Sequence, residues 1–203
     1  MRLWNGWGNE DSDLTMELSD GLRALLEALV GPGTALSQAT LNEVIAKVPN
    51  SRLGDHPLIK TEPEIRVRHA RGQSLPDWLE MHSGNVDTFP DGVAFPESSE
   101  QVRELLAHAK ENNLIVIPYG GGTSVVGHIN PETSDKPVLT IDMGKMNSML
   151  SIDTESQLAT FGAGTPGPIV EEELKKHGYT LGHFPQSWEL STLGGWVASR
   201  SSG

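Results

Sequence analysis

The sequence predicts an α+β fold, with short helices over residues 1–85 and a β–α–β unit within residues 86–203. Two observations support this division. In the first part, apolar residues recur at helical spacing between loops. From about Phe89 onward, short apolar runs alternate with a helical pattern, and one of these runs leads directly into three successive glycines.

The first 85 residues contain three predicted helices. Leucines at helical spacing (22, 25, 26 and 29) predict a helix near Asp20–Leu29, which Gly31-Pro32-Gly33 ends. Thr40-Leu41-Asn42-Glu43 forms a capping box that opens a second short helix. Ser74-Leu75-Pro76 can start a third, because proline is favoured in the first helical turn.

Two segments outside these helices have a composition of their own. Residues 1–18 show no periodicity, and we expect an extended arm in which Trp4 and Trp7 serve as packing anchors. Arg66-Val67-Arg68-His69-Ala70-Arg71 is the only basic cluster in an acidic chain. We expect it to form a solvated strand or loop that makes ion pairs with the acidic surroundings.

A β–α–β unit is predicted after residue 89. Val93-Ala94-Phe95 is a short strand candidate, and Ser98-Ser99-Glu100-Gln101 is a capping box. The helix that follows has a buried stripe made of Val102, Leu105, Leu106 and Ala109. Leu114–Ile117 is a continuous apolar run, which is typical of a strand buried on both faces. The unit is expected to be parallel and right-handed.

A glycine-rich loop, Pro118–Gly127, follows this strand. Glycine allows a positive φ and leaves the backbone bare of side chains. Consecutive N–H groups can then point into one concavity, which binds an anion such as a diphosphate. A flexible surface turn is the alternative, but the strand leading into the loop favours an anion site. The candidate residues are Pro118, Tyr119, Gly120, Gly121, Gly122, Thr123 and Ser124.

Two further strands are predicted, Pro137–Met143 and Leu158–Phe161. The segment between them is expected to be a loop. It carries the apolar residues Met146, Met149 and Leu150, which we expect to pack in the interior rather than bind a ligand.

A second glycine-rich turn, Gly162–Gly167, matches G-x-G-x-x-G formally and precedes a helix predicted over Pro168–His177. A dinucleotide fold needs an acidic residue at the end of the next strand, about twenty residues on. Glu189 stands in a loop there, and a proline inside the turn removes a donor. We therefore predict no nicotinamide site. A Walker A motif is excluded because His128-Ile129 stands where Lys-Ser/Thr is required.

Charge and composition exclude several classes of function. The net charge is −12 and basic residues rarely cluster, which disfavours binding to nucleic acid or anionic lipid. No apolar run approaches the ~20 residues of a transmembrane span, and the N-terminus carries no apolar leader. The chain has no cysteine, and its seven histidines are scattered, so no metal site is predicted. We expect a cytoplasmic protein with a small-molecule or lipid substrate.

The last stretch, residues 182–203, is dense in serine, threonine and glycine. Small and hydroxyl-bearing side chains at this density let a flat polar ligand lie against the backbone. Ser191 and Thr192 can cap a helix, so a capped, glycine-kinked helix in the core is the alternative.

These motifs together resemble the flavin-binding half of the vanillyl-alcohol-oxidase/p-cresol-methylhydroxylase (PCMH-type) flavoproteins. Within that superfamily the chain is most similar to the alkylglycerone-phosphate synthase family. The resemblance implies a PCMH-type FAD-binding domain over 86–203, made of a βαβ subdomain and the start of a second flavin subdomain, after a helical N-terminal region over 1–85. The matching stretches are Trp4–Gly8, Arg66–Gly72, Pro118–Ser124, Gly182–Ser187, Ser191–Val197 and Ser199–Gly203.

FAD is the cofactor that the resemblance implies. Pro118–Ser124 would wrap its diphosphate, and His183 matches an active-site histidine of the family beside the flavin ring. Thr123 stands where some relatives carry a flavin-linking histidine, so we expect non-covalent FAD. The residues that would line the rest of the flavin are Gln186, Ser187, Trp188, Glu189, Leu190, Ser191, Thr192, Ser199, Arg200, Ser201 and Ser202.

The implied reaction belongs to ether-lipid synthesis. It exchanges the acyl chain of acyl-dihydroxyacetone phosphate for a long-chain alcohol, with no net oxidation or reduction. The first alternative is an FAD-linked oxidase or dehydrogenase of a 2-hydroxy acid, and the second is a non-catalytic nucleotide-binding module. The resemblance also implies that a substrate cap lies beyond Gly203, so that residues 1–203 alone would bind FAD weakly and lack turnover. A homodimer stays open.

Overall fold

The computed structural model describes residues 2–11 and 18–201. Its central element is a four-stranded sheet with the strand order β1-β2-β4-β3. The strands are β1 (Ile59–Lys60), β2 (Gly92–Ala94), β3 (Ile115–Tyr119) and β4 (Val138–Asp142). β2 and β3 each run parallel to β4, and β1 is antiparallel to β2 at one edge. The predicted α+β class is confirmed.

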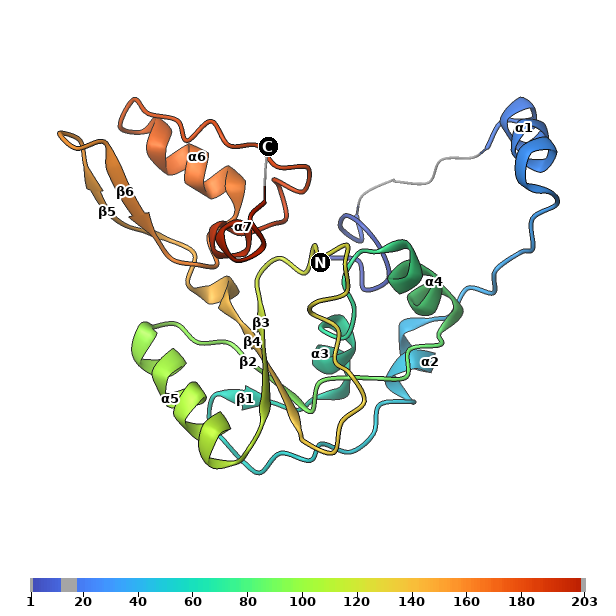
Figure 1. Cartoon of the computed structure of the whole chain (residues 1–203), viewed down its shortest axis with the longest axis horizontal. Coiled ribbons are helices and arrows are strands. Elements are labelled where there is room, and N and C mark those ends of the chain that lie inside the picture. Colours follow the sequence, from blue (N-terminus) through green and yellow to red (C-terminus); the bar gives the residue numbers. More distant parts are fainter. Residues whose placement is uncertain (1, 12–17, 202–203) are drawn as a thin grey trace.

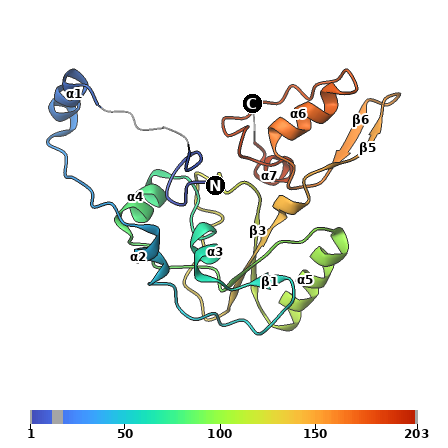
Figure 2. The same cartoon turned by 180° about the vertical axis from the view of Figure 1, so that it is seen from behind.

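Apart from α1, the remaining elements form three groups around this sheet (Figures 1 and 2). The long helix α5 lies on one side of the sheet, and the short helices α2, α3 and α4 gather on the other. A two-stranded antiparallel hairpin, β5–β6, lies with α6 and α7 above the sheet in the view of Figure 1. The bounds are α1 (Asp20–Val30), α2 (Leu41–Ile45), α3 (Pro63–Arg68), α4 (Leu75–Ser83), α5 (Ser99–Glu111), η1 (Met143–Lys145, a 3₁₀ turn), β5 (Met149–Asp153), β6 (Leu158–Phe161), α6 (Gly167–Lys175) and α7 (Leu193–Ser199).

The β–α–β unit forms as predicted in one respect and differs in two. β2 and β3 are parallel, but β4 is inserted between them. β3 is therefore an edge strand rather than a strand buried on both faces, which explains why it tolerates the exposed Pro118. On α5, Leu105 and Ala109 are buried, whereas Leu106 is 48% exposed, so the buried stripe is narrower than predicted.

Three helices of the N-terminal region, α1, α2 and α4, begin where the sequence predicts them, whereas α3 was not predicted. Capping boxes join Thr40 to Glu43 before α2 and Ser74 to Asp77 before α4. The helix α1 also forms, but its leucines at 22, 25, 26 and 29 remain 38–71% exposed. The segment around Met149, which was expected to be a loop, is instead strand β5, because it pairs with β6 as a hairpin. The apolar pattern of this segment does not predict that pairing.

The basic cluster is buried, so the prediction of a solvated strand or loop was wrong. Arg66 lies in α3 with 1% of its surface exposed, and its guanidinium donates to the carbonyls of Pro49 and Pro90 at 2.6 Å each. Burial lowers the pKa of Arg66. The predicted ion pairs are confirmed at Arg71, which contacts Glu80 and Asp87. A long aliphatic stem allows arginine to lie inside when carbonyls receive its head group.

Asp91 joins three segments at the edge of the sheet where β2 and β4 begin. Its carboxylate accepts hydrogen bonds from the Arg52 guanidinium at 2.7 and 2.9 Å and from the Val138 amide at 2.7 Å, with 2% of the residue exposed. Burial alone would raise the pKa of Asp91, but these hydrogen bonds outweigh it and hold the pKa below its ordinary value. The ionised carboxylate therefore stabilises the start of β4.

We expect Asp91→Ala to lower the free energy of unfolding by about 2 kcal/mol, because the buried Val138 amide loses its acceptor. The change of the exposed Asp55 to alanine is the control, with an expected effect within about 0.5 kcal/mol. Urea unfolding of both variants measures the difference. Equal stability would show that Asp91 does not hold β4.

The same group predicts a pH dependence. Since the folded pKa of Asp91 is lowered, its contribution is fully present above the unfolded pKa of roughly 4 and is lost as the pH falls through the folded value. The stability difference between the wild type and Asp91→Asn should therefore be constant near neutral pH and shrink below about pH 4. A difference that grows on acidification would contradict this sign.

Candidate functional site

The glycine loop leaves β3 at the carboxyl edge of the sheet. Because β3 and β4 are parallel, Tyr119 lies in register with Asp142, and both strands end at the same edge. The loop beyond it lies between α7 on one side and the N-terminal arm on the other (Figures 1 and 2). This is the edge of a parallel sheet at which ligands usually bind.

Each of the three glycines has its own steric requirement. A Cβ on Gly120 would overlap the Thr192 hydroxyl, and one on Gly121 would lie 2.8 Å from the Leu190 carbonyl carbon and 2.9 Å from the Ser191 Cα. Gly122 has a φ of +67° and lies over the ring of Tyr119. The positive φ thus falls on Gly122, while Gly121 is required by close backbone packing.

The amide groups of this loop are free within the described part of the chain. From Gly120 to Val125, no backbone N–H donates to an acceptor among residues 2–11 and 18–201. Backbone donors need partners when a site is closed to water. A run of such donors around a positive-φ glycine fits the phosphate oxygens of a diphosphate.

The second glycine stretch has the opposite character. The amides of Gly162, Gly164 and Thr165 donate to carbonyls of the chain at 2.9–3.1 Å. A Cβ on Gly162 or Gly164 would overlap the carbonyl oxygens of Met146 and Met143, so these glycines serve backbone packing. The stretch Gly162–Gly167 therefore has few free donors for a phosphate group.

The segment Ser187–Thr192 faces the glycine loop, as expected for residues that line one ligand. Ser187 Oγ lies 3.4 Å from Thr123 Oγ1, and the backbone of Leu190 and Ser191 contacts Gly121. Thr192 caps α7, as predicted, by accepting from the Gly195 amide at 3.3 Å.

Two indoles organise this segment. Trp196 donates from Nε1 to Ser191 Oγ at 2.6 Å, which uses one acceptor site of the Ser191 hydroxyl. Trp188 packs against Gly167, and its buried Nε1 has no acceptor within residues 2–11 and 18–201. The N–H of this predicted flavin-lining residue is therefore a buried donor that the described chain leaves unpaired.

Several predicted residues are exposed or lie at the far end of α7. Gln186 and Glu189 are exposed, and Pro118 is an exposed member of β3. Ser199, Arg200 and Ser201 lie at the far end of α7, where Ser199 Oγ donates to Gly195 O at 2.7 Å and Arg200 adopts a φ of +51°. Ser202 lies outside the described residues. The roles assigned to these residues stay predictions.

His183 is half-buried on the α7 side of the site. Its ring meets Trp196 edge-on with the ring centroids 5.1 Å apart. The preceding backbone is held by Glu171 of α6, whose carboxylate accepts from the Leu181 and Gly182 amides at 3.0 and 3.1 Å. The imidazole is therefore carried on an anchored segment, as a proton-transferring group requires.

Tyr119 forms the floor of the glycine loop. Burial raises the pKa of Tyr119 to about 12. The charge of Asp142 also raises this pKa, whereas the charge of Arg2 lowers it. The rings of His69 and Tyr119 pack in a tilted arrangement with their centroids 4.6 Å apart. The His69 ring nitrogens lie 2.9 Å from the Asp142 carboxylate and 2.7 Å from the Ile65 carbonyl. This cluster ties α3 to the ends of β3 and β4 and keeps the floor rigid.

Sequence reasoning missed the contacts that the N-terminal region makes with the loop. Arg2 donates from Nη1 to the Gly121 carbonyl, and the Gln73 amide donates to the Ser124 carbonyl at 2.6 Å. These contacts join residues far apart in the chain, and no local pattern announces them.

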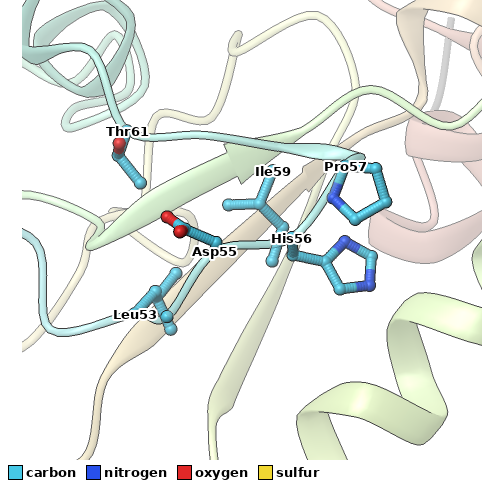
Figure 3. A pocket seen from close by; sticks show the side chains of 7 residues that line it. Leu53, Asp55, His56, Pro57, Ile59 and Thr61 are labelled. Atoms are coloured by element: carbon cyan, nitrogen blue, oxygen red, sulfur yellow. The ribbon is translucent and has the colours of Figure 1, made fainter.

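The cavity of about 360 Å³ in Figure 3 is a separate feature. It is lined by Leu53, Gly54, Asp55, His56, Pro57, Ile59 and Thr61. These residues lie in β1 and on either side of it in the chain, at the sheet edge opposite β3. The cavity is therefore not part of the glycine-loop site.

Among residues 2–11 and 18–201, His, Asp and Glu side chains do not gather in threes as a metal ion would require. In the same part of the chain, no helix is both long and apolar enough to cross a lipid bilayer.

The chain was compared with known proteins once this geometry was established. The family model for an FAD binding domain matches residues 90–203. Alkyldihydroxyacetonephosphate synthase of Dictyostelium discoideum is 40% identical over 145 residues, which are 71% of this chain and 24% of that protein. The enzyme of the same name from Caenorhabditis elegans is 32% identical over 98% of this chain and 38% of its own length.

Solved structures give the same result. An alkyldihydroxyacetonephosphate synthase structure superposes on the whole chain with a TM-score of 0.84 and 31% identity, over 42% of its own length. This chain thus spans well under half the length of the relatives it matches. A D-lactate dehydrogenase of Saccharomyces cerevisiae, 31% identical, covers a smaller share of this chain, 62%.

We expect Gly121→Val to abolish flavin binding by the full-length protein. The new side chain would enter the backbone of Leu190 and Ser191 and push the loop out of position. Gly33→Val is the matched control, because nothing lies within 4 Å of a Cβ at Gly33 and its φ is not positive. Flavin content per mole of purified protein measures the effect. Full flavin content in Gly121→Val would remove the loop from the site.

Proposed function

The chain belongs to the family of FAD-binding domains. On this premise we propose that it is the FAD-binding part of an enzyme of ether-lipid synthesis that exchanges an acyl chain for an alkyl chain. In this proposal the full-length protein replaces the acyl chain of acyl-dihydroxyacetone phosphate with a long-chain alcohol. FAD is the cofactor, and the loop Gly120–Ser124 holds its diphosphate.

The observation that carries the proposal is the extent of the likeness. The synthase of Caenorhabditis elegans aligns with 98% of this chain, including the N-terminal region that precedes the FAD-binding domain. The alternative, an FAD-linked dehydrogenase of a 2-hydroxy acid, rests on a shorter match. A flavin site alone would fit both reactions, so the N-terminal region favours the first.

The cofactor site itself is supported by the chemistry of the loop. With a net charge of −12, the chain repels a free diphosphate at long range, so local donors must hold it. The free amides from Gly120 onward supply such donors without added positive charge. When bound, the flavin supplies a redox-active ring that can also bond to a substrate carbon.

The proposed reaction balances without an oxidant. The bond between the reacting substrate carbon and the acyloxy oxygen breaks, and a bond from the same carbon to the alcohol oxygen forms. The hydroxyl proton of the alcohol passes to the released carboxylate, so the products are alkyl-dihydroxyacetone phosphate and a fatty acid. One proton leaves the reacting substrate carbon and one returns to it. His183, on its segment anchored by Glu171, is the residue proposed to accept or return this proton. A cytoplasmic location stays a prediction.

The proposal is tested with the flavin-loaded full-length protein, acyl-dihydroxyacetone phosphate and a long-chain alcohol. We expect alkyl-dihydroxyacetone phosphate and fatty acid in equal amounts. We also expect His183→Ala to retain flavin and to lower the rate about 10²-fold or more, the usual size of acid–base catalysis. His177→Ala, an exposed histidine near the end of α6, is the control with an unchanged rate.

Two outcomes would contradict the proposal. Reduction of the flavin by a 2-hydroxy acid, without formation of alkyl product, would favour the dehydrogenase. A near-normal rate in His183→Ala with full flavin content would assign His183 to the fold alone.

A further inference from the structure

We propose that the N-terminal region completes the flavin site by holding the glycine loop in its anion-binding conformation. Arg2 holds the middle of the loop, and Gln73 together with the Asp77–Asn130 pair holds its end. Arg2 and Asn130 are positioning residues in this account. The inference rests on the proposed assignment of Gly120–Ser124 to the FAD diphosphate.

The arm that carries Arg2 is a closed turn. Arg2 forms a β-bridge with Asn9, and the Leu3 amide donates to the Gly8 carbonyl at 3.0 Å. Arg68 of α3 fixes the turn by donating from Nη1 to the Arg2 carbonyl at 2.9 Å. The Arg2 side chain is therefore delivered to the loop from an anchored backbone rather than from a free end.

The contact of Arg2 sets the direction of a loop donor. Arg2 Nη1 donates to the carbonyl of Gly121. In a trans peptide, the C=O of Gly121 and the N–H of Gly122 point in opposite directions, and the described chain contains no cis peptide. Holding the carbonyl on the side of the arm therefore turns the Gly122 N–H toward the opposite side, where an anion can accept it.

A second anchor holds the end of the loop. The Gln73 amide donates to the Ser124 carbonyl at 2.6 Å. Asn130 donates from Nδ2 to the Asp77 carboxylate at 2.6 Å and accepts from the Gly72 amide at 3.0 Å. Asp77 is only 3% exposed, so this bond lies in the interior. A Cβ on Gly72 would approach the Ser124 carbonyl, so the two segments lie in tight contact.

Both anchors include residues that precede the FAD-binding domain in the sequence. The family match begins at residue 90, whereas Arg2, Gln73 and Asp77 precede it. A loop rich in glycine loses much conformational freedom when it closes around a ligand. Anchors that remove this freedom beforehand strengthen binding, and the guanidinium of Arg2 adds the positive charge that the loop itself lacks.

The test measures FAD affinity of the full-length apoprotein by titration of flavin fluorescence. We expect Arg2→Ala to raise the Kd for FAD about tenfold or more, in keeping with the loss of a charge-assisted hydrogen bond. Arg2→Lys should restore affinity to within about threefold of the wild type. Arg103→Ala removes an equal charge from the exposed face of α5 and should leave the Kd unchanged. The thermal midpoint of each apoprotein shows whether the fold is intact.

The second anchor is tested in the same titration with Asn130→Ala, which should also raise the Kd. If that variant fails to fold, the Arg2 series decides alone. An unchanged Kd in Arg2→Ala, with wild-type protein that binds FAD, would overturn the inference and leave the proposed function standing. A loss of affinity that Arg2→Lys does not restore would also overturn it. Wild-type protein that binds no FAD at all would instead refute the assignment of the loop.

Discussion

The close approach of Gly121 to the backbone of Leu190 and Ser191 is the contact on which the site depends. It presses the loop at the carboxyl edge of the sheet against the segment that caps α7. No side chain fits between the two, so the loop is left with bare backbone, and its amides from Gly120 to Val125 have no acceptor within the described residues. The glycines, the Thr192 cap and the packing of Trp196 on Ser191 all follow from this single constraint.

The constraint also explains how two glycine-rich stretches in one chain come to differ. Gly162–Gly167 binds its own backbone and lets the hairpin β5–β6 and α7 pack closely. Gly120–Gly122 packs against Tyr119 and the Leu190–Thr192 segment, but its amides have no acceptor within the described residues. Only Gly162–Gly167 matches the pattern G-x-G-x-x-G, so the sequence motif favours it over Gly120–Gly122. The two stretches differ in how many amide donors are free, and only the structure shows this difference.

Local signals predicted much of the fold and only part of the site. Capping residues and apolar spacing located α2, α4, α5 and the strands next to the glycine loop, because these signals act within a few residues. Strand order, the edge position of β3 and the burial of Arg66 were not predictable, because they depend on partners distant in sequence. Arg2 was missed for the same reason, since its contact spans 119 positions.

Hydrogen–deuterium exchange of the loop amides tests the central claim most directly. In the full-length protein, the peptide that carries the amides of residues 120–125 should exchange quickly without FAD, since those amides have no acceptor among the described residues. Addition of FAD should slow exchange there strongly, because phosphate oxygens would accept these hydrogen bonds. FAD binding that leaves exchange of this peptide unchanged would contradict the assignment of the loop to the flavin diphosphate.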